Sequence, residues 1–230
     1  MRLISSAILC GLVFSLARGQ DEPPKLKAAT TPEQAMKNLI AAARADDLKG
    51  FGLHLGNYHL ALFEMANATD SFYIALDEKF GKVKEAYRPW VKREFKRFKT
   101  PTFRLLDQTP KGMDKTALTI WIIHKEPGKE DFIQEEKWIA VKDGKAWKIN
   151  LPGKGMVREA IRKDADGKEV KVSVLTSREP SQKIMMEMEK RLNADTQVLE
   201  KLTRQVRAGE FRTREEAEKA LRQAEEKSKR

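Results

Sequence analysis

The apolar residues of this chain change their spacing at Pro101. Before Pro101 they recur every three or four positions, which predicts amphipathic helices. After it they alternate in four short runs separated by turn residues, which predicts strands. These runs are TFRLLDQ, KTALTIWIIHKE, DFIQEEKWIAVK and KAWKINL. Helices followed by consecutive strands predict an α+β fold, in which N-terminal helices pack on a bent antiparallel sheet.

The helical part begins with a capping pattern at Thr31. Pro32 suits the first helical position, and Gln34 follows Thr31 at the spacing of a capping box. A second helical stretch is predicted from about residue 58 to residue 98, with Pro89 breaking or kinking it. Together these helices can cover one face of the sheet.

The dipeptide Asp-Gly at residues 143–144 predicts a tight hairpin, because both central positions of a type I′ turn need positive φ. With this dipeptide at the centre of the turn, Trp138 faces Ile149 and Ala140 faces Trp147. Side chains alternate along a strand, so these four residues share one face of the sheet. We expect both tryptophans to belong to the core beneath the helices rather than to a ligand site.

The opposite face of the same strands is also apolar. Ile139 and Val141 point to it, and the run ALTIWII (residues 117–123) is apolar at both parities. A strand that is apolar on both faces is usually covered on both. The helices of residues 31–98 can cover only one face, so we expect the C-terminal helix or another subunit to cover the second.

The N-terminus, MRLISSAILCGLVFSLARGQ, has the layout of a secretory signal peptide. Arg2 precedes an apolar run that is shorter than the roughly 20 residues of a membrane span, and residues 17–19 form a small-x-small cleavage pattern. We therefore expect residues 1–19 to be removed and the protein to be periplasmic or secreted, with no transmembrane segment after cleavage. A retained signal anchor and a buried N-terminal helix are the alternatives. Residues 20–30 are polar and contain prolines, which predicts a flexible leader.

The only cysteine, Cys10, lies inside the predicted signal peptide. The mature chain would therefore contain neither a disulfide nor a cysteine metal site. The formal net charge of +11 favours anionic partners such as an envelope polymer or a lipid headgroup. Nucleic acid is not expected as a partner, because the export signal separates the protein from it.

The basic charge is concentrated in residues 82–104, where aromatic residues are interleaved with lysines and arginines. Lys92, Arg93, Lys96 and Arg97 would form a positive face opposite the aromatic side chains. This face either binds an anionic polymer or headgroup, or is the solvated side of an amphipathic helix.

The C-terminal part divides into a connector and a helical extension. Residues 153–180 contain both strand-like and helix-like spacings and stay unassigned. Residues 181–230 predict an amphipathic helix that stops at Gly209, followed by a short helix capped by Thr213. The a and d positions of the first helix carry Met185, Met188, Leu192, Leu199, Leu202 and Val206. Such a seam predicts packing within the chain or a homodimer.

The order of a capped helix ending in ARADDLKGF, further helices, and strands closing with EEKWIAVKDGKAWKINLP resembles the cystatin-like or NTF2-like superfamily. The resemblance covers about residues 31–152 and implies a cone of helices wrapped by a bent sheet. Members of that superfamily include pocket enzymes, extracellular domains and dimerising modules. The C-terminal run LEKLTRQVRAGEFRTREEAEKAL is similar to short helical hairpins appended to bacterial envelope proteins.

A pocket in such a cone would use an acid, a base or a tyrosine. Tyr58, Asp70, Tyr73 and His124 have the required side chains, but none lies in a catalytic motif. The three histidines lack the spacing and the additional ligands of a zinc site, so we expect no metal and no cofactor.

The favoured prediction is an exported, non-enzymatic NTF2-like domain with a helix for packing or self-association and an unknown role in the cell envelope. One alternative is a small-molecule binder or pocket enzyme that uses the cone. The other is a binder of anionic envelope polymers through the basic segment 82–104.

Overall fold

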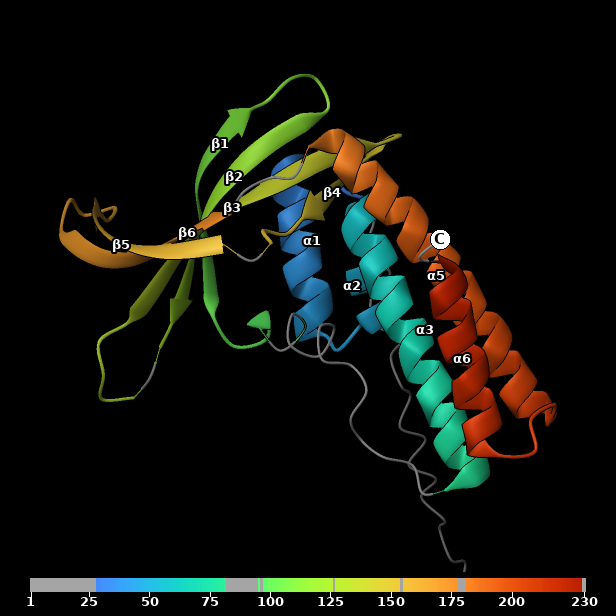
Figure 1. Cartoon of the computed structure of the whole chain (residues 1–230). Helices are drawn as coiled ribbons and strands as arrows, with labels where there is room; N and C mark the ends of the chain where they lie inside the picture. The colour runs from blue at the N-terminus through green and yellow to red at the C-terminus, as the bar shows by residue number, and fades with distance from the viewer. Residues whose placement is uncertain are drawn as a thin grey trace, which may run out of the picture.

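The computed structural model describes residues 28–81, 95, 97–125, 127–153, 155–177 and 181–228, and these form an α+β fold. The helices are α1 (Pro32–Arg44), α2 (Leu48–Leu53), α3 (Asn57–Phe80), α5 (Gln182–Ala208) and α6 (Arg214–Ser228). The strands are β1 (Thr102–Pro110), β2 (Lys115–His124), β3 (Phe132–Asp143), β4 (Ala146–Asn150), β5 (Gly155–Lys163) and β6 (Glu169–Ser177). The α+β class predicted from the sequence is confirmed. Along the chain, helices precede the strands and further helices follow them (Figure 1).

The predicted start of α1 is confirmed. The Thr31 hydroxyl accepts a hydrogen bond from the Gln34 backbone N–H at 3.1 Å, and Pro32 is the first helical residue. The Gln34 side chain reaches back one residue further than a capping box requires and accepts from the Thr30 N–H at 3.0 Å. Of the second predicted helical stretch, α3 covers Asn57–Phe80, and Phe95 and Arg97 are again helical; Pro89 lies outside the described residues.

The turn between β3 and β4 differs from the predicted one by one position. Asp143 stays in β3 opposite Ala146, so Gly144 and Lys145 form the loop, and only Gly144 has positive φ, at 61°. Glycine at the first loop position is the signature of a type II′ turn rather than type I′. The Asp143 carboxylate pairs with Lys148 Nζ at 2.6 Å across the strands, which holds Asp143 in the ladder.

This difference moves the register by two residues, so Ala140 rather than Trp138 faces Ile149. A shift of two preserves the alternation of side chains, so the predicted face is nevertheless correct. Trp138, Ala140 and Ile149 are fully buried on it, and Trp147 packs against them half-buried.

Side chains fill the space between α1, α2 and the sheet. The Phe98 ring lies 5.3 Å from the rings of both Trp138 and Phe103, and 5.4 Å from that of Phe51. Phe98, Trp138 and Phe51 are each fully buried. The interior of the predicted cone is therefore a packed aromatic core.

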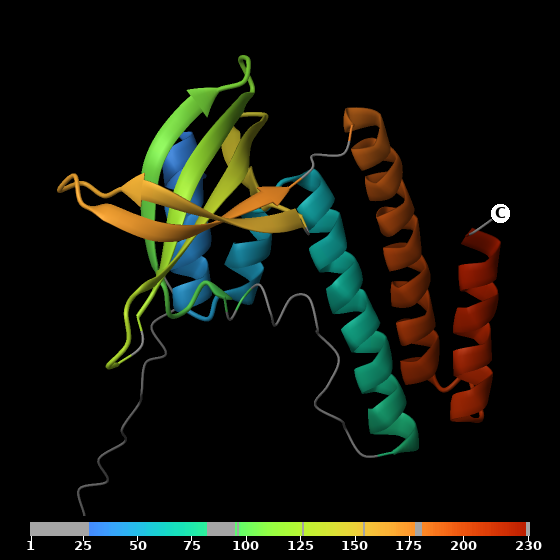
Figure 2. The ribbon, with the colours of Figure 1, turned by 60° about the vertical axis from the view of Figure 1, so that its left-hand side comes forward.

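The second face of the sheet is covered by the hairpin of β5 and β6, which forms from the unassigned connector. β6 pairs in parallel with β3 at Gln134 and Glu135, beside the part of β3 that pairs with β4. The hairpin then crosses the sheet on the side away from α1 (Figure 2). Trp121 on the sheet and Val172 on β6 are almost fully buried. Of the two covers expected for this face, the C-terminal helix is wrong, because α5 packs on α3; another subunit on it stays a prediction.

The C-terminal helices instead form a three-helix bundle with α3. α3 and α5 run side by side in the same direction, and α6 returns antiparallel to them (Figures 1 and 2). Leu199, Leu202 and Val206 of α5 are buried here with residues of α3 and α6. An ion pair of 2.7 Å between Arg214 Nη1 and the buried Asp77 carboxylate joins the start of α6 to α3.

A buried carboxylate lies within the aromatic core. Glu136 is fully buried and accepts from the Trp138 indole N–H at 2.8 Å and from the Gln134 amide at 2.6 Å. Arg97 supplies its counter-ion. Because a buried charge is tolerated only when it is paired and hydrogen-bonded, this network is a condition for the core to form.

We expect Glu136→Ala to lower the free energy of unfolding by about 3–5 kcal/mol, because it removes the acceptor of Trp138 and the counter-ion of Arg97. Urea denaturation followed by far-UV circular dichroism measures this value. The exposed Glu130→Ala is the control and should change it by no more than about 0.5 kcal/mol. A loss below about 1 kcal/mol for Glu136→Ala would contradict the assigned role of the network.

Candidate functional site

The four residues predicted to line a pocket do not come together. Tyr58, Asp70 and Tyr73 lie on α3, and His124 lies at the end of β2. At a rise of about 1.5 Å per residue, Tyr58 and Asp70 are roughly 18 Å apart along the helix. His124 packs against Phe132 with ring centroids 5.8 Å apart. These residues therefore share no site in the structure.

Each of the α3 residues has a local environment of its own. Tyr58 contacts His59 edge-on at 5.1 Å between centroids, and Tyr73 contacts Phe72 in the same way at 5.4 Å. Asp70 is buried on α3, and Tyr73 packs at the border of the bundle core. These contacts are those of packing residues.

Of the four residues predicted to bind anions, the structure describes only Arg97 in full. Lys92, Arg93 and Lys96 lie outside the described residues. Arg97 pairs with the buried Glu136, so its guanidinium serves the core. The remainder of the basic segment is left as a prediction from sequence.

The histidines next to α2 and α3 are buried and serve the fold. Burial lowers the pKa of His54; Asp47 raises it and Lys148 lowers it, and the net shift is downward. His59 Nδ1 lies 3.5 Å from the Asn150 side-chain oxygen. Within the ranges that the structure describes, no group of three or more histidine, cysteine, aspartate or glutamate side chains could hold a metal ion.

A carboxylate on the second face of the sheet has the perturbed pKa that often marks a functional site. Glu135 accepts from the Trp121 indole N–H at 3.1 Å, and from Arg162 Nε and Nη2 at 3.1 and 3.2 Å. Burial raises the pKa of Glu135, but the hydrogen bonds from Arg162 and Trp121 outweigh burial and hold it below its ordinary value.

Both oxygens of Glu135 are thus occupied by groups of the same chain. The arrangement fixes the β5–β6 hairpin to β3, which is a structural role. Sequence reasoning missed this pair, because Glu135 and Arg162 are 27 positions apart and lie in different predicted segments.

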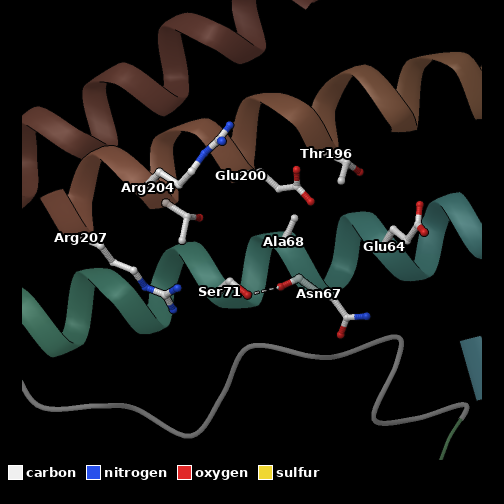
Figure 3. Close-up of a pocket in the computed structure, with 9 residues that line it drawn as sticks. Glu64, Asn67, Ala68, Ser71, Thr196, Glu200, Arg204 and Arg207 are labelled. Atoms are coloured by element: carbon white, nitrogen blue, oxygen red, sulfur yellow. Dashed lines mark hydrogen bonds between the residues drawn. The ribbon is translucent and has the colours of Figure 1, made fainter. Parts of the chain in front are cut away.

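One candidate for a binding site is an open groove of about 530 Å³ between α3 and α5 (Figure 3). Its floor consists of small side chains. Because they are small, they leave space between the two helices. Arg204 and Arg207 lie towards one end and Glu64 towards the other, with Glu200 between them (Figure 3). The described lining residues are Glu64, Asn67, Ala68, Ser71, Thr196, Glu200, Thr203, Arg204 and Arg207.

The hydroxyl groups of this groove are already used as donors. Thr196 donates to the Leu192 carbonyl at 2.8 Å, Thr203 to the Leu199 carbonyl at 2.7 Å, and Ser71 to the Asn67 carbonyl at 3.0 Å. Among the described lining residues there is neither a histidine nor a cysteine to make a nucleophile–base pair. The rim can form ion pairs with groups of either sign, but it holds no catalytic arrangement.

The amino-terminal half of α5 carries the most unusual surface of the bundle. Ile184, Met186 and Met188 are 49, 63 and 42% exposed. The second half of the same helix buries Leu199, Leu202 and Val206. A helix that is buried at one end and exposes large apolar side chains at the other has an unpartnered face.

None of the helices in the described residues is long and apolar enough to cross a membrane. Comparisons of the chain with protein-family models, with curated proteins and with solved structures find no match. The NTF2-like resemblance therefore stays a prediction that rests on the order of the elements.

The Glu135–Arg162 pair predicts a specific loss of stability in acid. Because the pKa of Glu135 is lower in the folded than in the unfolded state, its contribution is present above the ordinary carboxyl pKa and is lost as pH falls through the folded value. We expect Glu135→Gln to cost about 1–3 kcal/mol at neutral pH.

Urea denaturation of both proteins across the pH range measures this dependence. The difference between wild type and Glu135→Gln should shrink as pH falls below the ordinary carboxyl pKa and through the lower pKa of folded Glu135. A difference that stays constant down to the acid limit would show that the charge of Glu135 does not stabilise the fold.

Proposed function

We propose that the chain is an exported, non-enzymatic α+β module of the NTF2-like type that associates with a second copy through the amino-terminal half of α5. The observation that carries the proposal is the exposure of Ile184, Met186 and Met188 on that segment. Burying a large apolar side chain stabilises an interface by about 1.5–3 kcal/mol. Ile184 and Met188 are four positions apart and lie on one side of the helix, whereas Met186 projects to the opposite side, so exposed apolar surface surrounds this end of α5.

The exposure of this segment follows from the lengths of the two parallel helices. Glu64 and Thr196 line the same groove, as do Ser71 and Thr203, so the two helices differ by 132 positions in register. Residues 182–188 then precede the level of Asn57, where α3 begins. α5 extends beyond α3 at this end (Figure 2). At about 1.5 Å per residue the extension is about 10 Å long, or nearly two turns.

A second copy of the chain is the occupant that the segment fits. Met188 continues the heptad whose later positions are used inside the bundle and is exposed, while Met185 and Leu192 on the same stripe are half-buried. The flanking positions carry both signs of charge, with Lys183 and Lys190 beside Glu187. An antiparallel copy can therefore pair opposite charges along both sides of the apolar seam.

The non-enzymatic part of the proposal is supported by how the polar groups are used. Aromatic side chains occupy the helix-facing interior, Glu135 and Glu136 are saturated by indole and guanidinium donors, and the groove hydroxyls donate to their own helices. Each of these described groups already has a partner within the chain.

Export is supported by the signal-like residues 1–19. We expect the protein expressed from its full-length gene to be recovered outside the cytoplasm with Gln20 as its first residue. Cell fractionation followed by N-terminal sequencing measures this. Recovery in the cytoplasm with Met1 or Arg2 at the N-terminus would contradict export.

The self-association is tested by replacing Ile184, Met186 and Met188 together with serine. Wild type should sediment as a dimer or a larger species at high concentration, and the triple variant should sediment as a smaller species with an unchanged far-UV spectrum. The matched control replaces the exposed Leu53 and Met113, which lie on other elements, with serine and should behave as wild type. Equal masses for wild type and the triple variant would contradict the proposal.

A further inference from the structure

β5 is a free edge of the six-stranded sheet. Among the strands that the structure describes, the order is β1-β2-β3-β6-β5, so within them β5 has a hydrogen-bonded neighbour on one side only. All nine of its residues except Ala160 are exposed. Met156, Val157 and Ile161 are 65, 60 and 67% exposed. A long exposed edge strand is a template for pairing with another chain, and the charged side chains that β5 carries beside its apolar ones restrict which partner fits.

The backbone groups that point outward from this edge can be identified. Asp164 donates its N–H to the Lys168 carbonyl at 2.9 Å, which makes these two residues a hydrogen-bonded pair at the end of the hairpin. The register between β5 and β6 continues without a shift. Because hydrogen-bonded and non-bonded pairs alternate, the even-numbered residues of β5 bond to β6. The odd-numbered residues, from Val157 to Lys163, present their N–H and C=O groups to the free side.

We infer that this edge pairs with β5 of a second copy, antiparallel and centred on Ile161. In that register Ile161 faces its own counterpart, Glu159 faces Lys163, and Arg158 faces Asp164. Opposite charges thus lie on both sides of an apolar centre, and each occurs twice because of the two-fold symmetry. The outward N–H and C=O groups of Ile161 meet those of its counterpart.

The neighbouring registers are disfavoured by their charges. In a two-fold antiparallel pair, facing side chains lie on the same side of the sheet. The two-fold axis must therefore pass between one residue and the same residue of the other copy, which is the centre of the register. A centre at Glu159 opposes two glutamates, a centre at Arg158 opposes two arginines, and a centre at Ala160 opposes Arg158 to Arg162. Like charges directly opposite each other destabilise a strand pair. Charge complementarity therefore selects the second copy and its register together.

The β5 contact is independent of the contact proposed for α5, and the two lie on different parts of the molecule (Figure 2). Each contact is two-fold and self-complementary. A chain with two such contacts links alternately through one and the other, so its assemblies extend beyond a dimer unless the geometry closes a ring. The edge strand and the helix would then act together as the two connectors of a larger assembly.

The charge pattern is tested by reversal and rescue in the full chain. Glu159→Lys places two lysines face to face on each side of Ile161 and should weaken the β5 association roughly tenfold or more. Adding Lys163→Glu restores opposite charges and should restore association. Both residues are exposed, and the ion pair of 2.9 Å that Glu159 forms with Lys171 is an exposed one that contributes little to stability, so far-UV circular dichroism should show both variants folded. Sedimentation velocity in the background of the α5 triple serine variant isolates the β5 contact from the one at α5.

A disulfide tests the register directly in the same background, with Cys10→Ser added. Ile161→Cys should form an intermolecular disulfide under mild oxidation, because facing residues of a hydrogen-bonded antiparallel pair have Cα atoms about 5.5 Å apart. Val157→Cys is the matched control and should form far less, since residue 157 would face Ala165 of the other copy. Equal or absent cross-linking of the two variants, or no rescue by Lys163→Glu, would overturn the inference, whatever the outcome for α5.

Discussion

Two adjacent glutamates hold the two faces of the sheet. Glu135 points to one face, where it binds the Trp121 indole and the guanidinium of Arg162. Glu136 points to the other, where it binds the Trp138 indole and Arg97. Each carboxylate is buried, and a buried charge is tolerated only because these donors pair with it. The consequence is that neighbouring residues of one strand fix the hairpin on one side and the aromatic core on the other.

This double anchoring explains where the molecule can carry its function. The inner face is occupied by aromatic side chains, and the outer face is crossed by the β5–β6 hairpin. The sheet therefore presents its edges, rather than a cavity, for contacts with other molecules. Several exposed apolar side chains gather at two extremities of the described structure, the first turns of α5 and the outer edge of β5, and others lie singly elsewhere. Both proposals place contacts with other chains at these extremities.

The fold could be predicted from the sequence where local patterns decide it. The Thr31 cap, the α+β class and the shared face of Trp138 and Ile149 all follow from spacing within a few residues. Residues 155–177 could not be assigned, because Val157, Ala160 and Ile161 have helical spacing and become a strand only by pairing with β6 and β3. Likewise, the neighbouring sequence does not indicate that Glu135 and Glu136 are buried, because their partners Arg162 and Arg97 lie in distant segments of the chain. The four pocket candidates were chosen by residue type alone, which does not carry spatial information.

The central claim is that this protein acts through contacts at the first turns of α5 and the edge of β5 rather than through an internal site. Hydrogen exchange of the wild-type protein, measured by mass spectrometry at low and at high protein concentration, tests it most directly. The account predicts that residues 155–163 and 182–192 become more protected at high concentration, while the region around Glu135 and Glu136 is equally protected at both. Exchange in these two segments that does not depend on concentration would contradict it.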